Sequence, residues 1–377
     1  MADLSLYIHI PYCKRKCTYC NFHFSTQLST KNLLLNALNT EIIDRANEIP
    51  QSKVSSIYFG GGTPSVLDIS ELEFILKNIN STYSLGEHLE ITLEANPDDL
   101  NLNFLRDLKK IGINRLSIGI QSFQDADLQF MNRAHNAEQS HFAIQNSIKA
   151  GFNNISCDLI FGIPMCSHEL WITNIHSLFN YKIPHLSCYA LTIEENTKLH
   201  FDIRSNKIKP LNDSHTVEQM EILLDEMASH DYEAYEISNY CKKNFRSQHN
   251  SNYWKNGNYL GFGPSAHSYN GSTRRWNIAN NLQYIQNISE GKNFFEFETL
   301  SLTNKYNEYL MLNLRKMEGI DMNFIQSQFP EFFPNLFKGI QKFIINGSLI
   351  RNNESVYLSN KGKYISDHII RDLFEVE

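Results

Sequence analysis

Three cysteines near the start of the chain, Cys13, Cys17 and Cys20, are spaced as C-x3-C-x2-C directly after a predicted strand, Leu4–Ile10. Three closely spaced thiolates on one loop can hold three irons of a [4Fe–4S] cluster, which needs four ligands in all. One iron then keeps an open position for a small molecule, as the metal of a catalytic zinc site does. The spacing therefore predicts a cluster with one open iron.

Two other interpretations of these cysteines remain open on the residues alone. A structural zinc site would need a fourth ligand, which His23 or a distant cysteine could supply. The thiols could also be unlinked, although Lys14, Arg15 and Lys16 put the loop in a polar setting. A disulfide framework is not expected, because the seven cysteines are odd in number and thinly spread through a long chain.

Composition narrows the class of protein. A length of 377 residues allows two domains, and 42% hydrophobic residues are enough for a sizeable core. The formal net charge of −7 argues against a nucleic-acid-binding face. The sequence has no apolar run of about 18 residues and no export signal at its start, so we expect a cytoplasmic protein.

Short apolar runs alternate with helical patterns through the first two-thirds of the chain. Six such β-α repeats predict an α/β fold, a partial (β/α)6 TIM-like barrel. The predicted strands are Leu4–Ile10, Val54–Phe59, Leu89–Glu94, Arg115–Gln121, Asn154–Phe161 and His185–Leu191. The predicted helices are Thr30–Asn47, Ser70–Ile79, Leu102–Ile111, Ala137–Ala150 and His168–Phe179.

Polar and glycine residues recur at or near the ends of these strands. Besides the cysteine loop they are Gly60–Thr63, Glu94, Gln121 and Asp158. Barrel enzymes carry their chemistry at the C-terminal ends of the strands, so we expect one common site there. The glycines would let the backbone approach a ligand closely. Taken singly, each carboxylate could instead be a structural residue satisfied by nearby N–H groups.

The pattern changes in the last third, and we divide the chain into three parts. Residues 1–240 form the partial barrel, 241–300 a connecting segment, and 301–377 a small domain. That domain reads as helices followed by a hairpin turning at Asn352-Asn353, which predicts a mainly helical, winged-helix-like unit. DNA binding does not follow, because the segment is not notably basic and fold does not imply function.

The cysteine array, the Gly60-Gly61-Gly62-Thr63-Pro64 strand end and the Glu94-Ala-Asn-Pro97 strand together resemble the radical S-adenosylmethionine (SAM) superfamily. Further motifs place the resemblance in the branch of oxygen-independent coproporphyrinogen III oxidase, and it covers nearly the whole chain. These motifs are Tyr7–Pro11, Ser117–Phe123, Asp158–Pro164 and Tyr259–Gly263.

The resemblance implies a role for each residue of the expected site. Cys13, Cys17 and Cys20 would ligate the [4Fe–4S] cluster, whose open iron takes the amino and carboxylate groups of SAM. The SAM-binding residues would be Tyr7, Tyr19, Gly61, Gly62, Thr63, Glu94, Gln121, Arg133 and Asp158. Reduction of the cluster can, in the superfamily, cleave SAM to a deoxyadenosyl radical, while the protein orients the cofactor and excludes water.

Two features point to the heme chaperone subgroup of this branch. The porphyrinogen-oxidising enzymes carry a further cysteine two residues after the third cluster ligand, where this chain has Phe22. The run His249-Asn-Ser-Asn-Tyr-Trp254 resembles the H-N-x-x-Y-W signature of the subgroup. His249 is a plausible heme iron ligand, and Tyr253 and Trp254 offer flat apolar surface. His267 is a second candidate, which could instead line the SAM pocket.

The resemblance implies a protein that binds heme and transfers it to acceptor proteins, respiratory ones among them. It also implies an electron donor for the cluster, and it allows a homodimer and a peripheral position at the inner face of a membrane. The alternatives are a coproporphyrinogen III oxidase, which is a radical SAM decarboxylase, and a zinc-stabilised interaction protein. Met165-Cys166 replaces the usual Gly-Gln of the family, which puts SAM cleavage in question more than SAM binding.

Overall fold

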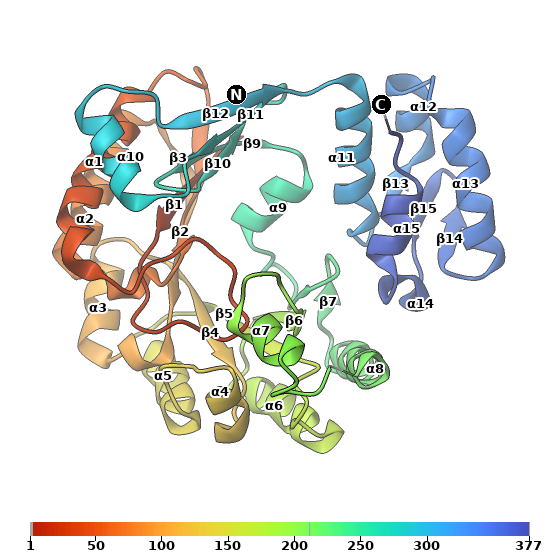
Figure 1. The fold of residues 1–377 in the computed structure, drawn as a ribbon, viewed down its shortest axis with the longest axis horizontal. Helices are drawn as coiled ribbons and strands as arrows, with labels where there is room; N and C mark the ends of the chain where they lie inside the picture. Colours follow the sequence, from red (N-terminus) through yellow and green to blue (C-terminus); the bar gives the residue numbers. More distant parts are fainter. Residues whose placement is uncertain (1–2, 211, 377) are drawn as a thin grey trace.

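The computed structural model describes residues 3–210 and 212–376. Its main body is a sheet of 12 strands in the order β12-β11-β10-β9-β1-β2-β3-β4-β5-β6-β8-β7. Strands β1 to β6 and the neighbouring β9 pair in parallel, and the outer strands pair antiparallel. The order is linear, with β12 and β7 at its two edges, so the sheet curves as an open, partial barrel (Figure 1).

The six predicted strands are confirmed, most of them to within a few residues. The central strands are β1 (Asp3–Ile10), β2 (Lys53–Gly61), β3 (Leu85–Ala95), β4 (Arg115–Gln121), β5 (Asn154–Phe161) and β6 (His185–Ala190). The added strands are β7 (Glu233–Ala234), β8 (Asn239–Cys241), β9 (Asn258–Phe262), β10 (His267–Tyr269), β11 (Thr273–Asn277) and β12 (Phe295–Thr299). Residues 241–300 therefore extend the sheet beyond β1.

Helices cover the outer face of the sheet (Figure 1). The helices of the main body are α1 (Lys31–Asp44), α2 (Ile69–Thr82), α3 (Leu102–Lys110), α4 (Asp125–Phe130), α5 (Ala137–Lys149), α6 (His168–Asn180), α7 (Lys198–Arg204), α8 (Asp213–Ser229), α9 (Gln248–Trp254) and α10 (Asn281–Ser289). Their apolar faces and the sheet share one large core, from Leu4 to Phe262. Helix α9 instead lies inside the curve of the sheet, where it packs against β2 (Figure 1).

A second, separate core lies in the C-terminal part, between Tyr306 and Leu373. It is built from α11 (Leu302–Leu314), α12 (Met322–Gln328), α13 (Phe333–Ile345), α14 (Asn360–Lys363) and α15 (Ser366–Asp372), with a sheet of β13 (Ile320–Asp321), β15 (Ser355–Leu358) and β14 (Leu349–Asn352). The hairpin at Asn353, whose φ is 53°, is where the sequence predicts it. This confirms the mainly helical C-terminal part.

In the part of the chain that the structure describes, no helix is both long and apolar enough to cross a membrane. The three-part division of the chain stays a prediction, although the two cores are distinct.

Candidate functional site

The cysteine loop leaves the C-terminal end of β1 and is fastened to the end of β2. The Gly62 N–H donates to the carbonyl of Ile10 at 2.9 Å, and the Thr63 N–H donates to that of Tyr12 at 2.7 Å. A Cβ at Gly62 would lie 2.7–2.8 Å from backbone atoms of Ile10 and Tyr12. Glycine is therefore needed here so that the two strand ends can touch.

The other side of the loop is fastened to more distant segments. The Thr18 N–H donates to the Met131 carbonyl at 3.0 Å, and the Leu199 N–H donates to the Thr18 carbonyl at 2.8 Å. Lys14 pairs with Asp98 at 2.8 Å and with the adjacent Asp99. The loop is thus held from β2, β3, α4 and α7, which fixes where its thiols lie.

Side chains donate hydrogen bonds to Cys13 and Cys17, and the Phe22 backbone donates to Cys20. The Thr63 hydroxyl donates to Cys13 Sγ at 3.3 Å, and Arg133 Nη1 donates to Cys17 Sγ at 3.4 Å. Such bonds to ligand sulfurs are among the factors that set the potential of an iron–sulfur cluster. Burial raises the pKa of the Cys13 thiol to about 11 and also raises the pKa of Cys20, so binding iron releases protons.

The spacing of the three sulfurs does not match a tetrahedral zinc site. In the described residues, the three thiols do not gather with their ligand atoms within 4.8 Å of one another. Zinc–sulfur bonds of about 2.3 Å in a tetrahedron would place the sulfurs about 3.8 Å apart. His23, the proposed fourth zinc ligand, instead has its Nε2 2.7 Å from Asn281 Oδ1.

Arg133 joins several strand ends through its guanidinium group. Besides Cys17, it donates to Asn96 Oδ1 at 2.7 Å and to the Gly119 carbonyl at 2.8 Å, and it lies beside Tyr19. Asn96 also donates to the Thr63 hydroxyl at 3.4 Å. The sequence motif contained Asn96, but residue types alone gave no reason to assign it a role.

Tyr7, Tyr58 and Glu94 meet on the inner face of β1, β2 and β3. The Tyr58 hydroxyl donates to Glu94 Oε1 at 2.8 Å, and the rings of Tyr7 and Tyr58 stack with centroids 6.2 Å apart. A Cβ at Gly60 would lie 3.0 Å from both Glu94 and Tyr7. Burial, with a smaller contribution from Asp158, raises the pKa of Glu94 to about 7. Such a carboxyl is suited to meet a cationic ligand.

Asp158 lies on β5 and faces the same interior. Burial raises its pKa to about 6, although hydrogen bonds from Ser187 and Ser117 oppose the shift. The Ser117 hydroxyl lies 3.4 Å from the carboxylate. Two nearby carboxyls that both resist ionisation would be relieved by a positively charged ligand placed between them.

Gln121 ends β4 in a strained conformation. Its φ is 65°, in the left-handed region, and the register with β5 shifts between Gly119 and Gln121. A bulge of this kind re-aims a side chain at the end of a strand. The Gln121 amide lies against Gly119, where a Cβ would come within 2.9 Å of it.

His249 sits inside the barrel, beneath the residues just described. It is 1% exposed, and its ring stacks on Tyr58 with centroids 4.8 Å apart. The Ser56 hydroxyl donates to Ser5, so His249 Nδ1 must donate to Ser56 across 2.9 Å. Among the residues that the structure describes, its Nε2 has no hydrogen-bond partner. Burial lowers the pKa of His249 to about 3, so the ring is neutral with a free lone pair.

Glu90 of β3 holds α9 in this place. Its carboxylate accepts from the N–H groups of Gln248 and His249, both at 3.1 Å, and from the Ser247 hydroxyl at 3.3 Å. An acidic group at a helix N-terminus satisfies free N–H groups and the helix dipole. Glu90, like Tyr58, has a role here that the sequence did not predict.

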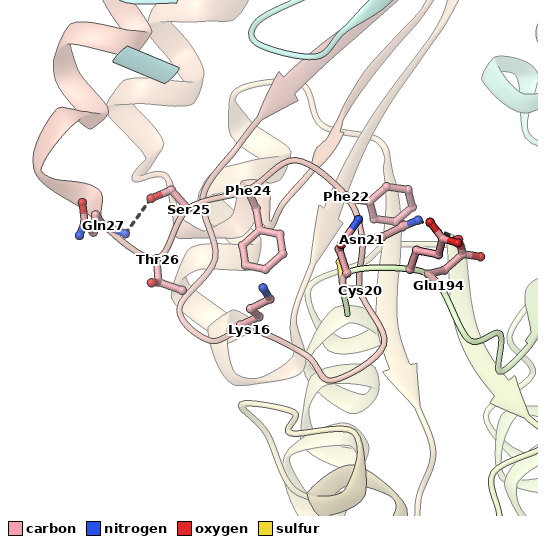
Figure 2. Close-up of a pocket in the computed structure, with 11 residues that line it drawn as sticks. Lys16, Cys20, Asn21, Phe22, Phe24, Ser25, Thr26, Gln27 and Glu194 are labelled. Carbon is pink, nitrogen blue, oxygen red and sulfur yellow. Dashed lines mark hydrogen bonds between the residues drawn. The ribbon is translucent and has the colours of Figure 1, made fainter. Parts of the chain in front are cut away.

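A hollow of about 810 Å³ opens beside the cysteine loop (Figure 2). Cys20, Lys16, Phe22 and Phe24 line one side, and Asn21 reaches across to Glu194 at 3.0 Å. Phe22 is 69% exposed at the edge of this hollow. A second hollow of about 310 Å³ lies between α9 and the C-terminal part, where Tyr253, Trp254 and Arg315 contribute to its lining.

The structure thus gathers at one end of the sheet most of the residues that the sequence selected. Tyr7, Tyr19, Gly61, Gly62, Thr63, Glu94, Gln121, Arg133 and Asp158 lie at or just inside the strand ends around the cysteine loop. His267 is exposed at the start of β10, with its ring stacked on Trp276. Cys166 is buried, and its carbonyl accepts from Gln219 of α8 at 2.8 Å.

Known proteins match this chain in sequence over nearly its full length. It is 33% identical to "Heme chaperone HemW" of Bacillus subtilis over 97% of both chains. It is 31% identical to the protein of that name from Haemophilus influenzae, over 100% of this chain and 99% of the other. The zebrafish (Danio rerio) protein "Radical S-adenosyl methionine domain-containing protein 1, mitochondrial" is 29% identical over 85% of this chain and 74% of its own.

Family models and solved structures agree with these relatives. Residues 7–172 match the radical SAM superfamily, and residues 300–365 match the HemN C-terminal domain. The coproporphyrinogen III oxidase HemN from Escherichia coli has the same fold, with a TM-score of 0.86 and 21% identity over 99% of this chain and 90% of that one. The chain belongs to the HemW family of heme chaperones, within the radical SAM superfamily.

Proposed function

We propose that this protein binds heme and hands it to heme-accepting proteins, and that it carries a [4Fe–4S] cluster and binds SAM. The family implies the cluster and SAM, and the full-length relatives named as heme chaperones support the cargo. Heme acceptors, an electron donor for the cluster and a homodimer are the partners that follow from this proposal.

The cysteine loop and its surroundings fit the two cofactors. Cys13, Cys17 and Cys20 would hold three irons of the cluster, and SAM would bind the fourth iron. The sulfonium centre of bound SAM supplies the radical chemistry of the superfamily. The Gly62 and Thr63 N–H groups are already bonded to the cysteine loop, so the ammonium group of SAM would be held through carbonyl oxygens of this segment. Glu94 and Asp158 would face the positive end of SAM.

Other residues around the loop would complete the SAM site. Tyr7 and Tyr19 would flank the cofactor, and Gln121 would meet its remaining polar groups. Arg133 would act through Cys17 and Asn96, which it already contacts.

The observation that carries the proposal is the side chain at position 22. The family resemblance places a cysteine there in the porphyrinogen-oxidising enzymes, and this chain has Phe22, which is 69% exposed beside Cys20. A phenyl ring can neither donate a proton nor form a radical as a thiol can. Its exposed apolar surface is suited to contact a macrocycle or a partner protein.

His249 would supply the heme iron ligand. A neutral imidazole with an unshared lone pair is the form that binds iron, and His249 Nε2 has that form. Since His249 is 1% exposed, a heme iron would reach it only after the surroundings of the ring open. Tyr253 and Trp254, one turn later on α9, line the hollow that also contains Arg315, where the ring and a propionate of heme would rest.

One anaerobic preparation tests the proposal against its main alternative. The cluster-loaded protein is titrated with heme and, in parallel, given coproporphyrinogen III with SAM and a reductant. We expect a Soret band of bound heme and no protoporphyrinogen. Turnover of coproporphyrinogen III would establish the oxidase instead, and the absence of a Soret band would refute heme binding.

His249→Ala tests the ligand within that assay. We expect at least about tenfold weaker heme binding and a shifted Soret band, because one axial ligand is lost. His267→Ala tests the second candidate, and we expect it to bind heme as the wild type does, because His267 is exposed and its ring already stacks on Trp276. Unchanged heme affinity in His249→Ala would remove only the ligand assignment.

A further inference from the structure

Helices α6 and α8 pack against each other on the outside of the sheet (Figure 1). They carry two clusters of potential metal ligands. The His168 triad consists of His168, His215 and Glu218, near the start of both helices. The His176 triad consists of His176, Glu226 and His230, near their ends. In each triad the ligand atoms lie within 4.8 Å of one another. Neither triad belongs to the site at the strand ends.

The spacing in the His168 triad matches a tetrahedral site. His168 Nε2 lies 3.1 Å from His215 Nδ1 and 3.3 Å from Glu218 Oε2. Zinc bonds of about 2.0–2.1 Å to nitrogen and oxygen, set at tetrahedral angles, place neighbouring ligand atoms about 3.3 Å apart. These two distances are close to those of a metal site, and the third pair of ligand atoms lies within 4.8 Å.

The tautomer of His215 is also the one that a metal needs. Its Nε2 donates to the Cys166 carbonyl at 3.1 Å, so its Nδ1 carries the lone pair and points toward His168. A histidine that binds a metal commonly donates its other N–H to a backbone carbonyl, which fixes the ring in place. His168 is partly exposed and can turn its Nε2 lone pair to the metal once the proton moves to Nδ1.

The His176 triad lacks this arrangement. His230 Nδ1 donates to the Glu226 carbonyl of its own helix at 2.9 Å, so that nitrogen holds a proton and offers no lone pair. His230 could then bind a metal only through Nε2, and the close pair that remains is His176 Nε2 and the Glu226 carboxylate, 2.8 Å apart. Helix dipoles favour a cation at this end and oppose one at the His168 triad. Ligand geometry therefore favours metal binding at the His168 triad, whereas the helix dipoles favour it at the His176 triad. Comparing metal binding at the two triads shows which effect is larger.

We propose that His168, His215 and Glu218 bind a divalent transition metal of the zinc type, with water completing the coordination. Two imidazoles and one carboxylate suit zinc, and three protein ligands leave a position open to solvent. Glu218 is 56% exposed and supplies the negative charge that offsets the helix dipoles. Because His215 also holds the Cys166 carbonyl, the metal would tie α8 to the turn that follows β5.

The test uses the full chain with its iron–sulfur cluster reconstituted, so that Cys13, Cys17 and Cys20 cannot take the probe. Zn²⁺ is titrated against a competing chromophoric chelator for the wild type, His168→Ala and Glu218→Gln. We expect one equivalent bound by the wild type and at least about tenfold weaker binding by both variants. The double variant His176→Ala/His230→Ala is the matched control and should bind as the wild type does.

Electron paramagnetic resonance of bound Cu²⁺ gives a second readout. The wild type should show hyperfine coupling to two imidazole nitrogens, and His168→Ala to one. Iron absorbance and circular dichroism confirm that each variant is folded. The proposal is overturned if the wild type takes up no Zn²⁺, if His168→Ala binds it unchanged, or if only the His176 control loses it.

Discussion

Glu94 offers a test of the SAM site through pH. Its carboxyl lies inside the barrel and accepts a hydrogen bond from the Tyr58 hydroxyl at 2.8 Å. Burial raises the pKa of this carboxyl to about 7. SAM carries a positive sulfonium centre, which favours the ionised carboxylate. A proton and SAM therefore compete for the Glu94 carboxylate. The affinity for SAM should be highest at a pH well above 7 and should fall as the pH drops through 7.

The size of the effect follows from the fraction ionised. With a pKa of about 7, Glu94 is roughly nine-tenths ionised at pH 8 and roughly one-tenth at pH 6. If only the ionised form binds SAM well, affinity falls about tenfold between these values, or ~1.4 kcal/mol. Asp158, with a pKa of about 6, extends the decline toward lower pH.

The assay is calorimetric titration of SAM into the cluster-loaded protein at pH 6 and pH 8. Glu94→Gln should bind about tenfold more weakly than the wild type at pH 8 and about equally at pH 6. Asp158→Asn should keep the pH dependence of SAM affinity but move it to lower pH, because removing the negative charge of Asp158 lowers the pKa of Glu94. S-adenosylhomocysteine, which lacks the sulfonium charge, should show a smaller dependence.

Wild-type affinity that is the same at both pH values would refute the electrostatic reasoning. So would a Glu94→Gln variant that keeps the full dependence. If SAM and S-adenosylhomocysteine respond alike, Glu94 meets the ribose hydroxyls and not the sulfonium.

Three further outcomes follow from geometry. Cys13→Ser should abolish the visible absorbance of the reconstituted cluster, whereas Cys157→Ser, which is buried on β5, should retain it. Gly62→Ala should lose iron while the protein stays folded by circular dichroism, because a Cβ there would displace the cysteine loop. Glu41→Gln should lower the free energy of unfolding in urea by about 3–5 kcal/mol, because its buried carboxylate pairs with a buried arginine. Glu73→Gln, from an exposed pair, should change it by less than about 1 kcal/mol; equal effects would contradict the argument.

The sequence predicted the sheet well because its strands are dense apolar runs, and Arg115–Gln121 and Asn154–Phe161 match the structure at both ends. It could not predict that residues 241–300 join the sheet, since β9 to β12 are short and join it through the pairing of β9 with the distant β1. It also missed Glu90 and Asn96, because each acts through hydrogen bonds to remote segments of the chain. Their residue types are ordinary, and only the fold makes them specific.

The sequence identified the histidine motif of residues 249–254, but it did not predict where the motif lies in the fold. The motif itself does not say whether His249 is exposed, and in the structure its side chain is buried. The cause is the carboxylate of Glu90, which draws the start of α9 into the barrel. No pattern within residues 249–254 records that partner, which lies more than 150 positions earlier.

Tyr58 contacts both the proposed heme ligand and the proposed SAM site. Its ring stacks on His249, and its hydroxyl donates a hydrogen bond to Glu94. A shift of His249 toward iron removes the support of that ring and changes how Glu94 is held. Heme and SAM would then be thermodynamically linked ligands: each must alter the other's affinity by the same factor. The protein could in this way sense through one tyrosine whether its cofactor is present before it accepts or releases its cargo.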